Sequence, residues 1–240
     1  MEGRARRWRT YFPTSIKSQE HFKMPLAGKG MLITSMDVDL ADESDFNIWY
    51  DREHLTERVA IDGFLEARRW LAAKASPKYF CTYSTRTFED LSSPAYKKAL
   101  ANQTDWSKTN ISRFKNMIRA VGRITLSRGV GRGGALGVVR LRPNAEGRDA
   151  LRARIRELLD PGTIAGIISM HLVESDPQLS TSLTEPDKPN PGASDWYVLI
   201  DGTDISAIGT LIDQRFRNTG AEVVSTGSYT LMWDLAKSDL

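Results

Sequence analysis

The alternation of apolar and polar positions predicts two successive sets of strands and helices with the same order. In each set a strand is followed by a helix, two strands, a second helix and a fourth strand. The strands expected from β-branched and aromatic stretches are 30–39, 64–73, 79–85, 117–127, 135–141, 167–173, 196–201 and 223–234. The helices expected between them are 46–59, 93–114, 145–159 and 205–218.

Equivalent positions in the two sets are separated by a nearly constant number of residues. Gly63 and Gly166 each precede a second strand and lie 103 positions apart. Gly122 and Gly227 lie in similar fourth strands and are 105 positions apart. A constant separation across separate elements indicates an internal duplication. The alternative is a chance similarity between two common strand endings.

A β-α-β-β-α-β unit is typical of the ferredoxin-like fold, an antiparallel sheet with both helices on one face. The bare face of such a sheet must be covered, and two sheets in one chain can meet and close at their edges. We therefore predict an α+β fold in which two tandem ferredoxin-like βαββαβ units form an intramolecular α+β barrel. Its interior is expected to hold a small-molecule ligand.

The pattern divides the chain into four parts: a flexible basic extension at 1–28, a first unit at 29–127, a glycine-rich linker at 128–134 and a second unit at 135–240. A phosphate-binding loop is not favoured for the linker, because a strand rather than a helix follows it. The extension could be a disordered tail, a targeting segment or the result of a misassigned start.

Charge and composition narrow the functional classes. The formal net charge is +3, and arginines in the first ten residues supply much of the excess. A basic face for nucleic acid is therefore not expected, and no apolar run is long enough to span a membrane. The single cysteine, Cys81, lies in an apolar strand and is interpreted as a buried, inert thiol. A chain that can form no internal disulfide fits a reducing compartment, so we expect a cytoplasmic protein.

The first predicted helix contains the clearest candidate for chemistry. Tyr50 and His54 are four residues apart, which places them on one face of that helix. An imidazole titrates near pH 6.5 and can act as a general acid or base. The alternative is an aromatic core helix in which His54 makes one structural hydrogen bond.

The run from Trp49 to Arg58 (WYDREHLTER), followed by Gly63 to Arg69 (GFLEARR), resembles the EthD-like branch of the dimeric α+β barrel superfamily. The motif covers about 25 residues of the first half, and the second half lacks it. The resemblance implies that only the first half retains a site and that the second half is its structural partner. The superfamily includes small monooxygenases, isomerases, cyclases and haem-degrading enzymes, so the resemblance leaves the reaction open.

A second candidate cluster lies on the second strand of the first half. Either Arg68 or Arg69 is expected to point inward, and Arg68 is equivalent to His171 at the same 103-residue separation. Arg68 and His171 could together bind a carboxylate or a phenolate, or both could face solvent. Aromatic residues are further candidates for binding the substrate, although such residues often belong to a core. These candidates are Trp49, Trp70, Tyr83, Trp106 and Tyr229.

Together these features predict an enzyme that acts by metal-free proton transfer on a small apolar carbonyl, lactone or aromatic compound. His54 would be the acid or base, Tyr50 its hydrogen-bonding partner and Arg68 an anion-stabilising group. The alternatives are a cofactor-free monooxygenase acting on a phenol and a ligand-binding barrel without turnover. No metal or other cofactor is expected, because no two histidines have ligand spacing. The chain is expected to be a monomer with an internal pseudo-dimer, or a homodimer that associates through its outer helices.

Overall fold

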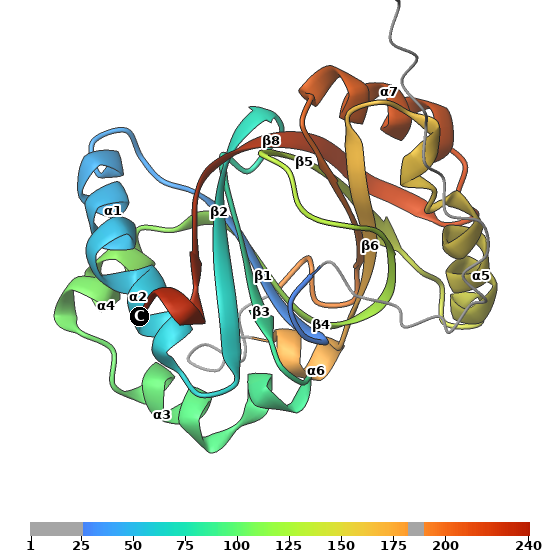
Figure 1. The fold of residues 1–240 in the computed structure, drawn as a ribbon. Helices are drawn as coiled ribbons and strands as arrows, with labels where there is room; N and C mark the ends of the chain where they lie inside the picture. The colour runs from blue at the N-terminus through green and yellow to red at the C-terminus, as the bar shows by residue number, and fades with distance from the viewer. Residues whose placement is uncertain (1–25, 182–189) are drawn as a thin grey trace, which may run out of the picture.

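Eight antiparallel strands form a closed barrel with helices on its outside (Figure 1). The computed structural model describes residues 26–181 and 190–240. The predicted α+β class and the predicted order of the elements are confirmed. The strands are β1 (Gly30–Asp37), β2 (Phe64–Lys74), β3 (Tyr79–Thr85), β4 (Lys115–Gly129), β5 (Ala135–Arg142), β6 (Ile167–Ser175), β7 (Trp196–Gly202) and β8 (Glu222–Ala236).

The helices depart from the predicted boundaries in the first half. The helix expected at 93–114 is two helices, because the chain turns at 102–104 and Thr104 caps the second by accepting the Ser107 N–H. The helix expected at 46–59 contains a π-helical turn, Tyr50–His54. The helices are α1 (Glu43–Trp49), α2 (Leu55–Ala60), α3 (Pro94–Ala101), α4 (Asp105–Ser112), α5 (Arg148–Leu158), α6 (Pro177–Ser180) and α7 (Ile205–Arg215). Short 3₁₀ turns lie at Glu89–Ser92, Pro161–Thr163 and Lys237–Asp239.

The order of the strands is the same in both halves of the chain. It runs β4-β1-β3-β2 in the first half and β8-β5-β7-β6 in the second. Strand β2 pairs with β8, and β6 pairs with β4, so each of the eight strands has a neighbour on both sides. Closure by backbone hydrogen bonds therefore removes the exposed edges that each four-stranded sheet would have alone.

The barrel interior is packed with side chains from both halves. Alternate residues along the strands point inward and pack against one another there. They include Met31, Ile33, Trp70, Phe80, Ala120, Leu136, Val138, Val173, Leu199 and Tyr229. The remaining strand residues point outward. They are covered by α1, α2, α3 and α4 in the first half and by α5 and α7 in the second (Figure 1).

The predicted linker and extension are more ordered than expected where the structure describes them. Strand β4 continues to Gly129, and Gly133 donates its N–H to Asp201. A side chain at Gly133 would overlap the carbonyl oxygen of Gly202, so this close approach requires glycine. Leu26 is buried in the interior cluster, so the predicted extension overlaps packed residues. The remaining predictions for that extension concern residues 1–25, outside the described part of the chain.

Candidate functional site

A cavity of about 710 Å³ lies between the outer face of the first-half sheet and the helices that cover it. Its floor comes from the strands: Leu32, Thr34, Met36, Tyr83, Met117 and Arg119. Its other walls come from the helical segments and include Tyr50, His54, Arg58, Tyr96, Ile111 and Phe114. The interior positions that the structure describes form a core, so this cavity lies on the opposite face of the strands from the ligand site that the sequence predicts.

Three residues of the first helical segment, Tyr50, His54 and Arg58, follow one another at intervals of four along the cavity wall. The N–H of Leu55 bonds to the carbonyl of Tyr50, which is the five-residue hydrogen bond of a π-turn. Residues four apart lie on the same side of a helical turn, and the ring centroids of Tyr50 and His54 are 4.9 Å apart, edge to face.

The His54 imidazole is buried and held by aromatic contacts. Its ring lies 4.2 Å from that of Trp49, whose indole N–H donates to Ser107 on α4. The hydroxyl of Ser107 donates in turn to Glu53. Burial lowers the pKa of His54 well below 6.5, and the positive charges of Arg58 and Arg69 lower this pKa further. The imidazole is therefore neutral near pH 7 and able to accept a proton.

Nδ1 of His54 is a buried polar atom without a hydrogen-bond partner among the described residues. The hydroxyls of Tyr83 and Thr34 also form no hydrogen bond of good geometry, but Tyr83 interacts with Tyr50 and Cys81, and Thr34 interacts with Cys81. Buried polar groups are nearly always paired, so an unpaired imidazole nitrogen in a residue of the cavity wall indicates a group that meets a ligand or water. The predicted hydrogen bond between Tyr50 and His54 is not formed, and the Tyr50 hydroxyl interacts with Cys81 and Tyr83 instead.

The arginine beside this site is Arg69 rather than Arg68. Its guanidinium lies 4.2 Å from the centroid of the Tyr50 ring and donates to Asn47 and Asp51. Burial raises the pKa of the Tyr50 phenol well above 10, so this hydroxyl stays protonated at neutral pH. Burial likewise raises the pKa of Tyr83 well above 10.

Arg68 and His171 do come together, but on the inner side of the barrel. Arg68 Nη1 lies 2.7 Å from Asp201 Oδ1, and His171 Nε2 lies 3.9 Å from Asp201 Oδ2. The carboxylate that these two groups were expected to bind is thus a residue of the protein. The prediction that Arg68 stabilises an anion beside His54 is corrected accordingly, because adjacent strand residues point to opposite faces.

The buried His171 predicts a loss of stability in mild acid. Burial lowers its pKa to about 3. Below about pH 6.5 the unfolded chain gains a proton at this residue and the folded chain does not, which lowers the free energy of unfolding by up to about 1.4 kcal/mol per pH unit. Urea unfolding between pH 6.5 and 5 should therefore show a smaller slope for His171→Asn than for wild type. Equal slopes would assign the acid sensitivity to other groups.

The predicted aromatic residues divide between three environments. Tyr83 is part of the cavity wall, and Trp49 lies behind His54. Trp70 and Tyr229 belong to the barrel interior, away from the cavity. Trp106 packs against the first-half core, and its indole N–H donates to Asp45.

Sequence reasoning missed three basic residues of the cavity, Arg58, Lys108 and Arg119. Arg58 continues the four-residue spacing of Tyr50 and His54, and that spacing could have identified it. Arg119 is brought to the site by strand pairing, since it lies opposite Thr34. No local pattern marks that contact.

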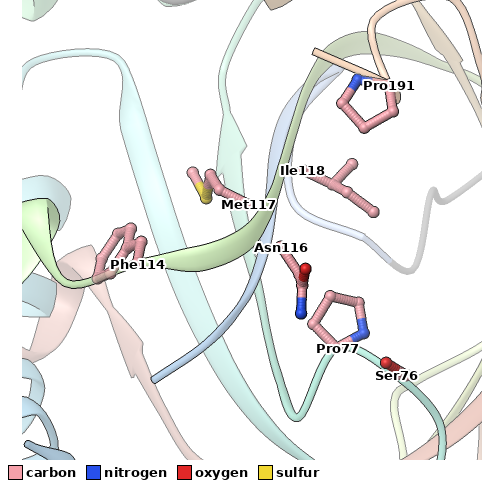
Figure 2. A pocket seen from close by; sticks show the side chains of 7 residues that line it. All are labelled: Ser76, Pro77, Phe114, Asn116, Met117, Ile118 and Pro191. Atoms are coloured by element: carbon pink, nitrogen blue, oxygen red, sulfur yellow. The ribbon is translucent and has the colours of Figure 1, made fainter. Parts of the chain in front are cut away.

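A second hollow of about 510 Å³ adjoins the cavity. Figure 2 shows Phe114 and Met117 at one end of this hollow and Pro77 and Pro191 farther along it. Phe114 and Met117 contribute to both spaces, so they form the partition between them.

The second half has an apolar core in the equivalent place. The space between its sheet and helices α5 and α7 contains Leu151, Ile155, Ile208, Leu211 and Phe216. These residues pack against outward-facing strand residues such as Val139 and Leu172. The two halves therefore share a strand order and differ in what fills the helix–sheet interface.

Metal-binding and thiol chemistry receive little support from the described residues. Within 26–181 and 190–240, no three histidine, cysteine, aspartate or glutamate side chains lie close enough to hold a metal ion. Burial raises the pKa of the Cys81 thiol above its ordinary value, which favours the unreactive protonated form. In the same ranges, no helix is both long and apolar enough to cross a membrane.

Comparison with solved structures identifies proteins with the same fold. An anthrone oxidase-like protein superimposes with a TM-score of 0.61 at 9% identity, covering 90% of this chain and 97% of its own. A candidate monooxygenase from Lactobacillus acidophilus NCFM gives 0.56 at 10% identity, covering 88% and 97%. One from Fusobacterium nucleatum also gives 0.56 at 10% identity, covering 88% and 95%. No family model and no curated protein matches the sequence.

Proposed function

We propose that this protein is an enzyme in which His54 transfers a proton to or from a small, largely apolar carbonyl, lactone or aromatic compound bound in the cavity. One observation carries this proposal: the ring of His54 is neutral and forms part of the cavity wall, and its Nδ1 has no partner among the described residues. An unpaired neutral imidazole beside a cavity is placed to accept a substrate proton.

The surrounding groups suit the charge that such a step creates. Removing a proton from an acidic C–H or phenolic O–H leaves negative charge on a substrate oxygen. The hydroxyl of Tyr83 stays protonated, so it can donate a hydrogen bond to that oxygen in place of its interaction with Tyr50. The rings of Trp49 and Tyr50 contact His54 and can stabilise the positive charge that it gains, against the repulsion from Arg58 and Arg69.

We further propose that the architecture is a tandem pair of ferredoxin-like units of the EthD-like kind. The repeated strand order of the two halves supports this, because β4-β1-β3-β2 and β8-β5-β7-β6 place equivalent strands in equivalent positions. The motif from Trp49 to Arg58 supports the EthD-like part, since three of its residues belong to the cavity wall. In this proposal the second half closes the barrel and carries no equivalent site.

A second candidate function is a cofactor-free monooxygenase. The names of the structural neighbours favour it, and so does the site, because a phenolate formed by His54 could react with dioxygen. Incubating small phenols and 1,3-dicarbonyl compounds with the protein in D₂O separates the two reactions. Proton transfer alone predicts deuterium incorporation at the acidic carbon of the dicarbonyl, faster than in the same solution without protein, and no oxygen uptake. The monooxygenase predicts substrate-dependent oxygen uptake. If compounds bind and neither deuterium incorporation nor oxygen uptake is seen, the protein is a binding protein without turnover.

The pH dependence of turnover follows from the lowered pKa of His54. Because this pKa lies well below 6.5, the proton-accepting form of the free protein persists as the pH falls through that value. We expect kcat/KM to remain nearly constant between pH 7.5 and about 6 and to decline only in more acidic solution. A pH–rate profile for a substrate without its own titration in this range measures this. Half of the activity lost at pH 6.5 would show an ordinary, solvated imidazole.

A further inference from the structure

We infer that the ligand of this cavity is an organic anion, a carboxylate or an acidic phenolate, whose charge binds to Arg58. This inference rests on the proposed function, since it specifies the substrate class of the same site. The observation behind it is that Arg58 lacks the carboxylate partner that the other buried arginines have.

Arg58 is a buried arginine without a carboxylate of its own. The residue is only 6% exposed, and no hydrogen bond or ion pair joins it to another described residue. Its nitrogens are not among the fully buried atoms that lack a partner, so they are accessible from the cavity. Its neighbour in sequence, Glu57, is exposed and feels Arg58 only as a nearby charge. Removing a guanidinium from water is costly unless an opposite charge compensates for it.

Three other buried arginines are compensated. Arg68 pairs with Asp201, Arg69 with Asp51 and Arg140 with Asp195. The fold therefore supplies a carboxylate wherever an arginine is buried for structural reasons. Arg58 departs from that rule and belongs to a cavity wall. The missing negative charge is one that a ligand would supply.

The rest of the cavity is also positive. Arg119 and Lys108 contribute to its wall, whereas no aspartate or glutamate among the described residues does. Lys108 pairs with the exposed Asp105. Within the described part of the chain, the guanidinium of Arg119 donates to neutral oxygens, namely the carbonyls of Leu179 and Thr181 and the hydroxyl of Tyr96. Positive charge along the wall of a cavity favours an anion and opposes a cation.

The position of Arg58 on the helix lets one ligand contact both groups. Arg58 follows His54 by four residues, so their Cα atoms lie about 6 Å apart along the helix axis, and both residues are part of the cavity wall. An anionic group bound at Arg58 can therefore leave the rest of the ligand beside His54. A cavity of about 710 Å³ has room for a bicyclic aromatic acid.

The test compares two probes that differ only in charge, 2-naphthoate and 2-naphthamide, by calorimetric titration of the full chain. Wild type should bind the acid more tightly than the amide. Arg58→Met should weaken 2-naphthoate by about tenfold or more and leave 2-naphthamide within about twofold. Arg58→Lys should recover part of the loss. Arg154→Met removes an equal charge from the exposed surface of α5 and should change neither affinity.

The amide also reports whether the variant is folded. Two results with Arg58→Met would overturn the inference: an equal loss of affinity for both probes, or an unchanged affinity for the acid. The inference is also overturned if the wild-type protein binds the two probes with equal affinity or binds neither. None of these results depends on turnover. The proposed proton transfer fails separately, if His54 can be replaced without loss of activity.

Discussion

Replacing His54 by glutamine is expected to lower kcat by at least about a hundredfold while leaving the protein folded. Glutamine is similar in size and can form hydrogen bonds, but it cannot accept a proton. The contacts of His54 with Trp49 and Tyr50 are ring contacts, so the loss of stability should be modest compared with the loss of rate. Steady-state kinetics with a substrate found by deuterium exchange or oxygen uptake measures the effect, and circular dichroism checks the fold.

A matched control is available on the other face of the sheet. His171 is also a buried, neutral histidine, but it lies against Asp201 on the inner side of the barrel. His171→Asn should retain turnover within a few fold at a temperature where it is folded. If His54→Gln keeps its activity, or loses no more than His171→Asn, then His54 does not transfer the proton.

Arg68→Met is expected to destabilise the protein by about 3–5 kcal/mol, because it leaves the carboxylate of Asp201 buried without its cation. The pair joins the two halves of the chain, since Arg68 lies on β2 and Asp201 on β7. Arg68 also donates to the carbonyl of Gly133 in the connection between the halves. Urea unfolding at pH 7 measures the change.

The double variant Arg68→Met/Asp201→Leu provides the control for this prediction. Removing both charges eliminates the unpaired carboxylate, so much of the lost stability should return. The folded single variant should still bind ligand in the cavity, because Arg68 lies on the opposite face of the sheet from His54. A loss below about 1 kcal/mol in Arg68→Met would mean that water or another cation already compensates Asp201.

The elements of the fold could be predicted because their signals are local. Strand 79–85 was predicted with the limits that β3 has, since its β-branched and aromatic run lies between clear breaks. The break between α3 and α4 was missed, because the polar residues at 102–104 also fit a continuous solvated helix. The closed barrel follows from the repeated order of elements, which is visible without any knowledge of contacts.

The location of the site could not be read in the same way. Alternation shows that neighbouring strand residues face opposite sides, but it does not show which side the helices cover. Arg68 and Arg69 illustrate this, as one meets Asp201 inside the barrel and the other meets Tyr50 outside it. Tyr50 and His54 were identified because helical spacing is local. The π-turn that contains them has no comparable local signal in the sequence.

The central claim is that an anionic ligand binds outside the barrel, against His54. Protein labelled with ¹⁵N at histidine contains only three such residues, His21, His54 and His171, so imidazole NMR signals can be assigned with the single variants. Saturation with 2-naphthoate should shift the signals of His54 and leave those of His171 unchanged. A ligand that shifts His171 and leaves His54 unchanged would place the site inside the barrel and contradict the account.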